Sequence, residues 1–274
     1  KRYSCSVNDV LRGMSIMGIK RTHSDSMSLY SSKLVELREE YHYFDEIDTE
    51  EKAYWLGFIY ADGNIRKDFY KLRVGLSISD ITHLEKLSEI FNVGITYEDK
   101  ESKVTPGKIN RSCIININSK HLVKMLIAKG ILPNKTYIDS TEVFNHIPDN
   151  LLHHFVRGFF DGDGCISFTN NKRRKCGYNT RVCISGRVKY LSYIHKIISD
   201  NCCTVGGKLY NHSCTNWLKE LRYDRTVDIS NIYKWLYNNA TLYLNRKKDR
   251  FNIFIMDNNL ASGILTINKP KSWV

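Results

Sequence analysis

The chain has 274 residues, of which 42% are hydrophobic and 12% aromatic, and this composition excludes an intrinsically disordered protein. Its 41 Lys and Arg outnumber its 29 Asp and Glu, so the formal net charge is +12, which favours a polyanionic partner such as nucleic acid over a basic protein without one. No apolar run approaches the roughly 20 residues of a membrane span and no secretory signal is present, so we expect an intracellular protein of the cytoplasm or nucleoid.

The eight cysteines form no CxxC pair, and no histidine pair stands beside them at zinc-ligand spacing. Two of them, Cys202 and Cys203, are adjacent in the sequence. This usage predicts reduced thiols rather than a disulfide framework or a structural zinc site.

Residues 1–46 come before the organised part of the chain. Ser6 is a suitable N-cap for a short helix over residues 7–17, and a Gly-Ile-Lys-Arg-Thr stretch follows it. Residues 24–32 are rich in serine, which is typical of a linker or of an extended segment along DNA. The first long helix is expected to begin after Asp48 or Thr49, either of which can cap it.

Two segments of the chain resemble each other. Residues 52–64 read KAYWLGFIYADGN, and residues 153–165 read HHFVRGFFDGDGC. Their alignment matches Gly57 with Gly158 and Asp62 with Asp163, at an offset of 101 residues. Two copies in one chain suggest the pseudo-twofold arrangement that a homodimer has in two chains. The alternative is a pair of tandem domains that share no site.

The same elements are expected after both copies. The first copy precedes a strand over 72–79, a helix over 81–91, strands over 94–98 and 113–118, and a helix over 120–129. The second precedes a strand over 180–185, a helix over 188–198, strands over 204–210 and 217–223, and a helix over 229–238. We therefore predict an α+β protein of two αββαββα repeats at 47–148 and 149–257, between an N-terminal helical segment with its linker at 1–46 and a C-terminal tail at 258–274.

Each repeated segment is an apolar helix that ends in Asp-Gly. Gly57 and Gly158 lie inside these helices, where glycine costs about 1 kcal/mol relative to alanine, a cost usually offset by close approach to another helix. Gly63 and Gly164 are expected at the C′ position with positive φ. Asp62 and Asp163 then lie at helix C-termini, where the helix dipole disfavours an anion and a divalent cation would reverse the penalty.

The paired segments resemble the signature of the LAGLIDADG homing endonucleases, and the resemblance covers roughly residues 47–257. It implies a saddle of two antiparallel four-stranded sheets that lies in the major groove of DNA, with the two motif helices at its centre. It implies a monomeric, site-specific endonuclease that cuts both strands of a long asymmetric DNA target and promotes mobility of its host intron or gene. The alternatives are an RNA-splicing maturase and a DNA-binding regulator on the same fold.

The resemblance also implies the site. Asp62 and Asp163 are the expected metal ligands, whereas the neighbouring Ala61 supplies none; Mg²⁺ is the expected cofactor, with Mn²⁺ able to substitute and Ca²⁺ able to bind without cleavage. One sequence departure is Tyr60, which replaces an acid that the second copy keeps as Asp161. Basic residues near the scissile phosphates are expected beyond the last helix of each repeat. They are Lys135 and Lys247, with Lys248 as a competing choice.

Two further groups of residues follow from the paired arrangement. Ser79 and Ser185 are expected at matching strand ends, where they would hold water at the site. Basic residues flank the first hairpin of each repeat, and residues 170–175 are expected to form a hairpin tip that reaches phosphates or guanine edges rather than a merely solvated turn. The expected DNA contacts are Arg66, Lys71, Arg73 and Lys67 in the first repeat and Lys172, Arg173, Arg174, Lys175 and Arg181 in the second.

The ends of the chain complete the expectation. In bacterial and phage members of the family, a helix-turn-helix element often precedes the first motif, and residues 1–21 resemble its second half; a simple helical arm is the alternative. The chain neither begins with a splicing Cys or Ser nor ends in His-Asn, so we do not interpret it as a whole intein. The resemblance implies no obligate protein partner and no membrane.

Overall fold

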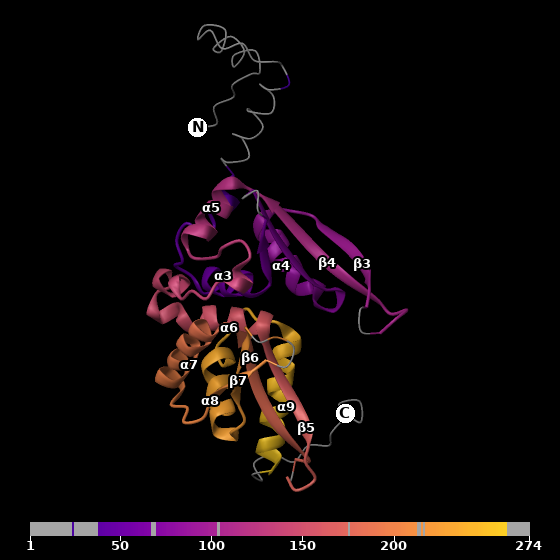
Figure 1. Cartoon of the computed structure of the whole chain (residues 1–274), viewed down its shortest axis with the longest axis vertical. Helices are drawn as coiled ribbons and strands as arrows, with labels where there is room; N and C mark the ends of the chain where they lie inside the picture. The colour runs from indigo at the N-terminus through magenta and orange to yellow at the C-terminus, as the bar shows by residue number, and fades with distance from the viewer. Residues whose placement is uncertain are drawn as a thin grey trace.

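The computed structural model describes residue 24 and residues 38–66, 70–102, 105–174, 176–212, 215 and 217–261. These residues form two halves, each a four-stranded antiparallel sheet covered by helices, which lie end to end (Figure 1). The predicted α+β class is confirmed. The helix expected over residues 7–17 and the helix-turn-helix element lie outside the described residues. Of the tail expected at 258–274, residues 258–261 belong to a helix and the rest lie outside the described residues.

The first half begins with 3₁₀ helix η1 (Glu39–His42) and helix α3 (Glu50–Asp62), which contains the first motif. Strands β1 (Gly63–Ile65) and β2 (Lys71–Ser77) lead through η2 (Ile78–Asp80) to helix α4 (Ile81–Phe91). Strands β3 (Ile95–Glu101) and β4 (Ile109–Asn118) and helix α5 (Lys120–Ala128) follow. The short helices η3 (Lys135–Tyr137), η4 (Glu142–His146) and η5 (Asp149–Leu151) connect this half to the next, and the sheet order is β1-β2-β4-β3.

The second half repeats this plan. Helix α6 (Leu152–Asp163), strands β5 (Gly164–Asn170) and β6 (Tyr178–Gly186) and helix α7 (Val188–Cys202) come first. Strands β7 (Lys208–Asn211) and β8 (Lys219–Tyr223) and helices α8 (Thr226–Tyr237) and α9 (Asn245–Ala261) complete it. The sheet order β5-β6-β8-β7 matches that of the first half, so the internal repeat in the sequence is also a repeat of topology.

Some predicted boundaries were wrong, and each has a physical cause. Strand β7 begins at Lys208 rather than at residue 204, because the N–H groups of Val205 and Gly206 donate to the Asp228 carboxylate instead of to a strand. Strand β4 begins at Ile109, since its polar first residues continue the backbone ladder with β3 without any apolar alternation. Helix α9 was not expected at all, because its sequence is largely polar.

Helices α3 and α6 lie side by side where the two halves meet (Figure 1). Thr49 is the N-cap of α3, and its side chain accepts a hydrogen bond from the Lys52 N–H at 3.2 Å. Every residue of α3 from Ala53 to Tyr60 is buried, because one face packs on α6 and the others on the first sheet. A helix that is apolar on all sides is a core helix. Because α3 packs against α6, the ends of both motifs lie at the centre of the molecule.

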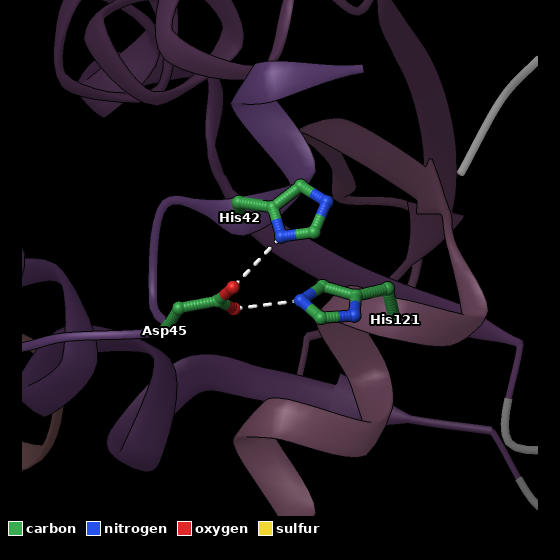
Figure 2. A group of neighbouring side chains, drawn as sticks. All are labelled: His42, Asp45 and His121. Carbon is green, nitrogen blue, oxygen red and sulfur yellow. Dashed lines mark hydrogen bonds and ion pairs between the residues drawn. The ribbon is translucent and has the colours of Figure 1, made fainter. Parts of the chain in front are cut away.

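The segment that enters α3 is tied to α5 by three side chains (Figure 2). The two carboxylate oxygens of Asp45 lie 2.7 Å from His42 Nδ1 and 2.7 Å from His121 Nε2. Lys129 Nζ donates to the Asp45 backbone oxygen at 3.0 Å. The ligand-type atoms of this group lie within 4.8 Å of one another, but the group is separate from the motif helices. Among the described residues, none of the helices combines the length and apolar character needed to span a bilayer.

Candidate active site

The two motif helices touch through their glycines. A Cβ on Gly57 would lie 2.0 Å from the Phe155 backbone oxygen, and one on Gly158 would lie 1.9 Å from that of Tyr54. Both distances are far inside van der Waals contact, so no larger residue fits without separating the helices. The predicted close approach is confirmed, and it brings the C-terminal ends of the two helices together.

The expectation of positive φ at the two terminal glycines was wrong. Gly63 has φ −73° and ψ 145°, and Gly164 has φ −79° and ψ 159°, so both are extended and pass directly into a strand. Steric space, not backbone conformation, explains the glycine. A Cβ on Gly63 would lie 2.5 Å from the Ile59 backbone oxygen, and one on Gly164 would lie 2.3 Å from the Phe160 ring.

Asp62 and Asp163 end the two helices on either side of this contact. Asp62 Oδ2 would lie only 3.2 Å from a Cβ on Gly162, so its carboxyl reaches α6 beside Asp163. Burial raises the pKa of Asp62, against the attraction of Lys135, Lys247 and Arg246. Desolvation by the surrounding protein and then repulsion from Asp62 raise the pKa of Asp163 to about 7, although one side of Asp163 stays open to solvent. Two carboxyls that oppose each other's ionisation form a site that favours a cation.

Each half places one lysine at the junction of its motif helix and first strand. Lys135 Nζ donates to the Gly63 carbonyl, and Lys247 Nζ donates to the Gly164 carbonyl. Burial lowers the pKa of both lysines, while the two aspartates near Lys135 raise its pKa again. The two lysines therefore occupy equivalent places relative to the two aspartates. Lys248 has a different place, because its Nζ lies 3.7 Å from the centre of the Tyr243 ring.

No family model and no curated protein matches this chain, but solved structures do. The homing endonuclease I-WcaI bound to its DNA recognition sequence has a TM-score of 0.54 and 13% identity, over 74% of this chain and 87% of that one. A point mutant of I-SmaMI has a TM-score of 0.51 and 13% identity, over 77% and 92%. The LAGLIDADG homing endonuclease I-GzeII in complex with its DNA target has a TM-score of 0.50 and 15% identity, over 77% and 91%.

This chain has the LAGLIDADG homing endonuclease fold. The predicted saddle of two sheets and the resemblance of the paired motifs are thereby confirmed at the level of the fold. At these identities the comparison gives the architecture, and the roles of individual residues depend on the geometry of this chain.

Within this LAGLIDADG fold, Tyr60 in the first half and Asp161 at the matching position in the second half both have structural roles. Asp161 is fully buried and accepts hydrogen bonds from Tyr54 Oη at 2.8 Å, Tyr237 Oη at 2.5 Å and the Leu244 N–H at 2.8 Å. Burial raises its pKa to about 6, against the effect of these hydrogen bonds. Tyr60, its counterpart, donates to the Ser140 carbonyl at 3.4 Å. Each residue thus binds the segment that carries the lysine of its own half.

Sequence reasoning missed a second buried polar residue on the motif helix, Arg157. Its guanidinium donates to the Leu236 and Leu242 carbonyls at 3.0 and 2.9 Å and to Glu50 at 2.7 Å. Arg157 is fully buried, and an arginine within an otherwise apolar motif was the signal that could have identified it. It fixes the segment before Lys247 to both motif helices.

The predicted serines lie in different environments. Ser79 is exposed within η2 and donates to Ser77 Oγ at 3.0 Å, so it stands two residues beyond the strand end expected for it. Ser185 lies within β6, where it pairs with Glu220. The two are therefore not at equivalent strand ends.

The predicted DNA-contacting residues follow the hairpins. Arg73 and Arg181 lie on β2 and β6 and form ion pairs of 2.7 Å with Glu98 and Asp224. Between β5 and β6, where the sequence predicts a hairpin tip over 170–175, the Asn171 N–H donates to the Gly177 carbonyl at 2.8 Å. The described basic residues of the two hairpins that are exposed are Arg66, Lys172, Arg173 and Arg174, whereas Lys71 is half-buried on β2. Lys67 and Lys175 lie outside the described residues.

Proposed function

We propose that this protein is a site-specific homing endonuclease that makes metal-dependent double-strand breaks in a long asymmetric DNA target, and so promotes mobility of its host intron or gene. The observation that carries the proposal is the pair of carboxyls at the ends of two helices in glycine contact, each with a lysine beside it. The neighbours I-WcaI and I-GzeII, which share the fold, are named as homing endonucleases bound to DNA. The protein acts as a monomer, because one chain supplies both halves of the site.

The donor set fits a hard divalent cation. Asp62 and Asp163 offer carboxylate oxygens, the ligands that Mg²⁺ prefers, and a bound cation would relieve the repulsion that Asp62 exerts on Asp163. Mg²⁺ is therefore the proposed cofactor, with Mn²⁺ as a substitute and Ca²⁺ binding without cleavage. When bound, such a metal activates water and stabilises charge on the phosphate oxygens.

The residues of the chain supply the remaining parts of the reaction. Asp62 and Asp163, at the ends of α3 and α6, would hold the cation. Lys135 and Lys247 place a positive charge where negative charge develops on each scissile phosphate, or orient the attacking water. The open faces of the two sheets and the hairpin turns bind the DNA on either side, through Arg66, Lys67, Lys71, Arg73, Lys172, Arg173, Arg174, Lys175 and Arg181.

The test is to separate cleavage from binding. Purified protein is incubated with a library of DNA targets and Mg²⁺, and the selected target is then used with Asp62→Asn and Asp163→Asn. Each change removes a charge that faces the metal and leaves the strands unchanged, so double-strand cleavage should be lost while DNA affinity in Ca²⁺ is retained or raised. Asp200→Asn is the matched control, because Asp200 is exposed on α7 and forms an ion pair with Lys196 on the same helix.

The outcome decides between the alternatives. A wild-type protein that binds but never cuts any DNA would favour the regulator, and one that instead binds a structured intron RNA would favour the maturase. Asn variants that cut both strands at the wild-type rate would place the active site elsewhere. Asn variants that unfold would make these aspartates structural.

A further inference from the structure

The lysine of each half is carried on a short segment: residues 135–140 form the first lysine segment and residues 242–247 the second. Each segment is bound to the motif helix of its own half, through Tyr60 in the first and Asp161 in the second. These contacts do not join either segment to the opposite half. Two carboxylates outside the motifs, one for each segment, make that connection.

The first carboxylate is Asp80, which is almost fully buried at the start of α4 in the first half. Asp80 occupies the N-cap position of that helix, yet its side chain makes no capping hydrogen bond. Instead its Oδ2 accepts from Arg246 Nε at 2.7 Å, and Arg246 directly precedes Lys247 in the second lysine segment. The start of a first-half helix is therefore bound to the lysine of the second half.

The second carboxylate is Asp139, four residues after Lys135 in the first lysine segment. Helix α7 of the second half begins after Arg187, which provides no side-chain cap. The two oxygens of Asp139 accept from the Lys189 and Tyr190 N–H groups, at 3.0 Å each, and so cap α7 from the other half. A carboxylate at a helix N-terminus also interacts favourably with the helix dipole.

The two contacts correspond under the pseudo-twofold relation. In the topology, α4 and α7 are equivalent helices, each following the first hairpin of its half. In both contacts a carboxylate joins the start of that helix to the lysine segment of the opposite half, although the carboxylate comes from the helix in one and from the segment in the other. The first lysine segment gains a further contact, since the Tyr137 and Trp217 rings lie 5.2 Å apart.

We propose that Asp80 with Arg246, and Asp139 with the N-terminus of α7, are two latches between the halves that position Lys247 and Lys135, so that each latch controls cleavage of one DNA strand. The inference rests on the proposed function. Asp80 acts on Lys247 through Arg246, and Asp139 acts on Lys135 through its own segment, so both are positioning residues. Breaking one latch releases one lysine while the aspartates and the other lysine keep their places.

The experiment measures the two strands separately. Duplex target labelled on each strand is cut by wild type, Asp139→Ala and Asp80→Ala, and the nicking rate of each strand is recorded. A displacement of about 1 Å can cost on the order of a hundredfold in rate, so each variant should slow one strand by about 10- to 100-fold and leave the other within about twofold. Asp139→Ala should slow the same strand as Lys135→Met, and Asp80→Ala the same strand as Lys247→Met.

Asp228→Ala is the matched control for a merely structural role. The buried Asp228 carboxylate accepts from two backbone N–H groups, at 3.1 and 3.0 Å, just as Asp139 does, but these belong to a loop within the second half. This control should lower thermal stability and slow both strands equally. The double variant Lys135→Met with Asp139→Ala should be no slower than Lys135→Met alone, because the latch acts through the lysine.

A second readout does not need cleavage. Acetylation of lysines by an amine-reactive reagent, followed by mass spectrometry, should show faster modification of Lys135 alone in Asp139→Ala and of Lys247 alone in Asp80→Ala. Equal slowing of both strands, or unchanged modification of both lysines in folded variants, would overturn the latches. A wild type that cuts no DNA would count against the proposed function only, since the acetylation result would still decide the latches.

Discussion

The contact between the motif helices can be broken by a single methyl group. In Gly158→Ala the new Cβ would lie 1.9 Å from the Tyr54 backbone oxygen, whereas ordinary contacts begin near 3.4 Å. The helices must therefore separate locally by about 1.5 Å, and neither partner is a side chain that can rotate away. Overpacking of a core typically costs 1–3 kcal/mol, and a backbone clash belongs at or above the upper end, at about 4 kcal/mol.

Part of this cost is offset, because alanine has a helix propensity more favourable than that of glycine by about 1 kcal/mol. The net loss for Gly158→Ala is therefore about 3 kcal/mol, a large part of the stability of most proteins. At roughly 2–4 °C per kcal/mol for a chain of this size, the melting temperature should fall by about 6–12 °C. Gly57→Ala should behave in the same way, since its Cβ would lie 2.0 Å from the Phe155 oxygen.

Thermal unfolding followed by circular dichroism measures this loss. The matched control is Gly94→Ala, where no atom lies within 4 Å of the added Cβ, so its melting temperature should stay close to that of the wild type. The cleavage rate of Gly158→Ala should be reduced even at temperatures where the variant is folded, because separation of the helices also separates Asp62 from Asp163. If Gly158→Ala melted at the same temperature as Gly94→Ala, the glycine contact would not be what joins the two halves.

Three more predictions concern the site and its partner. Cleavage should require Mg²⁺ or Mn²⁺ and stop in EDTA, and full activity in the chelator would exclude the proposed mechanism. The pKa of Asp163 is raised to about 7 in the folded protein, so this carboxyl stabilises the metal-free protein at low pH and loses that contribution as the pH rises through 7. Asp163→Asn should therefore melt at a higher temperature than wild type at pH 8 without metal. A lower melting temperature would contradict the raised pKa of Asp163. DNA binding should weaken steeply between 50 and about 200 mM salt, as expected for a surface that displaces many counterions, and a flat response in a filter-binding titration would argue against it.

The internal repeat made the architecture predictable. Gly57, Gly158 and the two aspartates recur at one offset, and a pair of apolar helices that each contain a glycine has few ways to pack other than against each other. The glycines and aspartates of the two motifs are local patterns that recur, and recurrence separates a signal from chance in a single sequence. Lys135 and Lys247 were instead predicted from the resemblance to the LAGLIDADG signature, which implies a basic residue beyond the last helix of each repeat.

The rest of the site depends on contacts between residues far apart in the chain. Asp80 and Arg246 are separated by 166 positions, and Asp139 binds backbone N–H groups some 50 positions away. A backbone donor leaves no mark in the sequence, so no pattern could have indicated the cap that Asp139 provides. Gly63 and Gly164 show the opposite error: the residue type was informative, but it reported crowding by Ile59 and Phe160 rather than a left-handed backbone.

The two halves hold their lysines by different chemistry. The second lysine segment is bound by the buried Asp161 carboxylate and by the Arg157 guanidinium, which together engage the Leu242 carbonyl and the Leu244 N–H within 2.9 Å. At the equivalent position the first segment has a longer hydrogen bond of 3.4 Å from Tyr60, and Lys135 is less buried than Lys247. The first segment, which has Tyr60 where the second half has Asp161, is also bound by the opposite half, through Asp139 and the Tyr137–Trp217 contact. A homodimer could not evolve this division, because both copies of a residue would change together. A single chain with two unequal halves can, and unequal halves agree with the asymmetric DNA target that we propose for this protein.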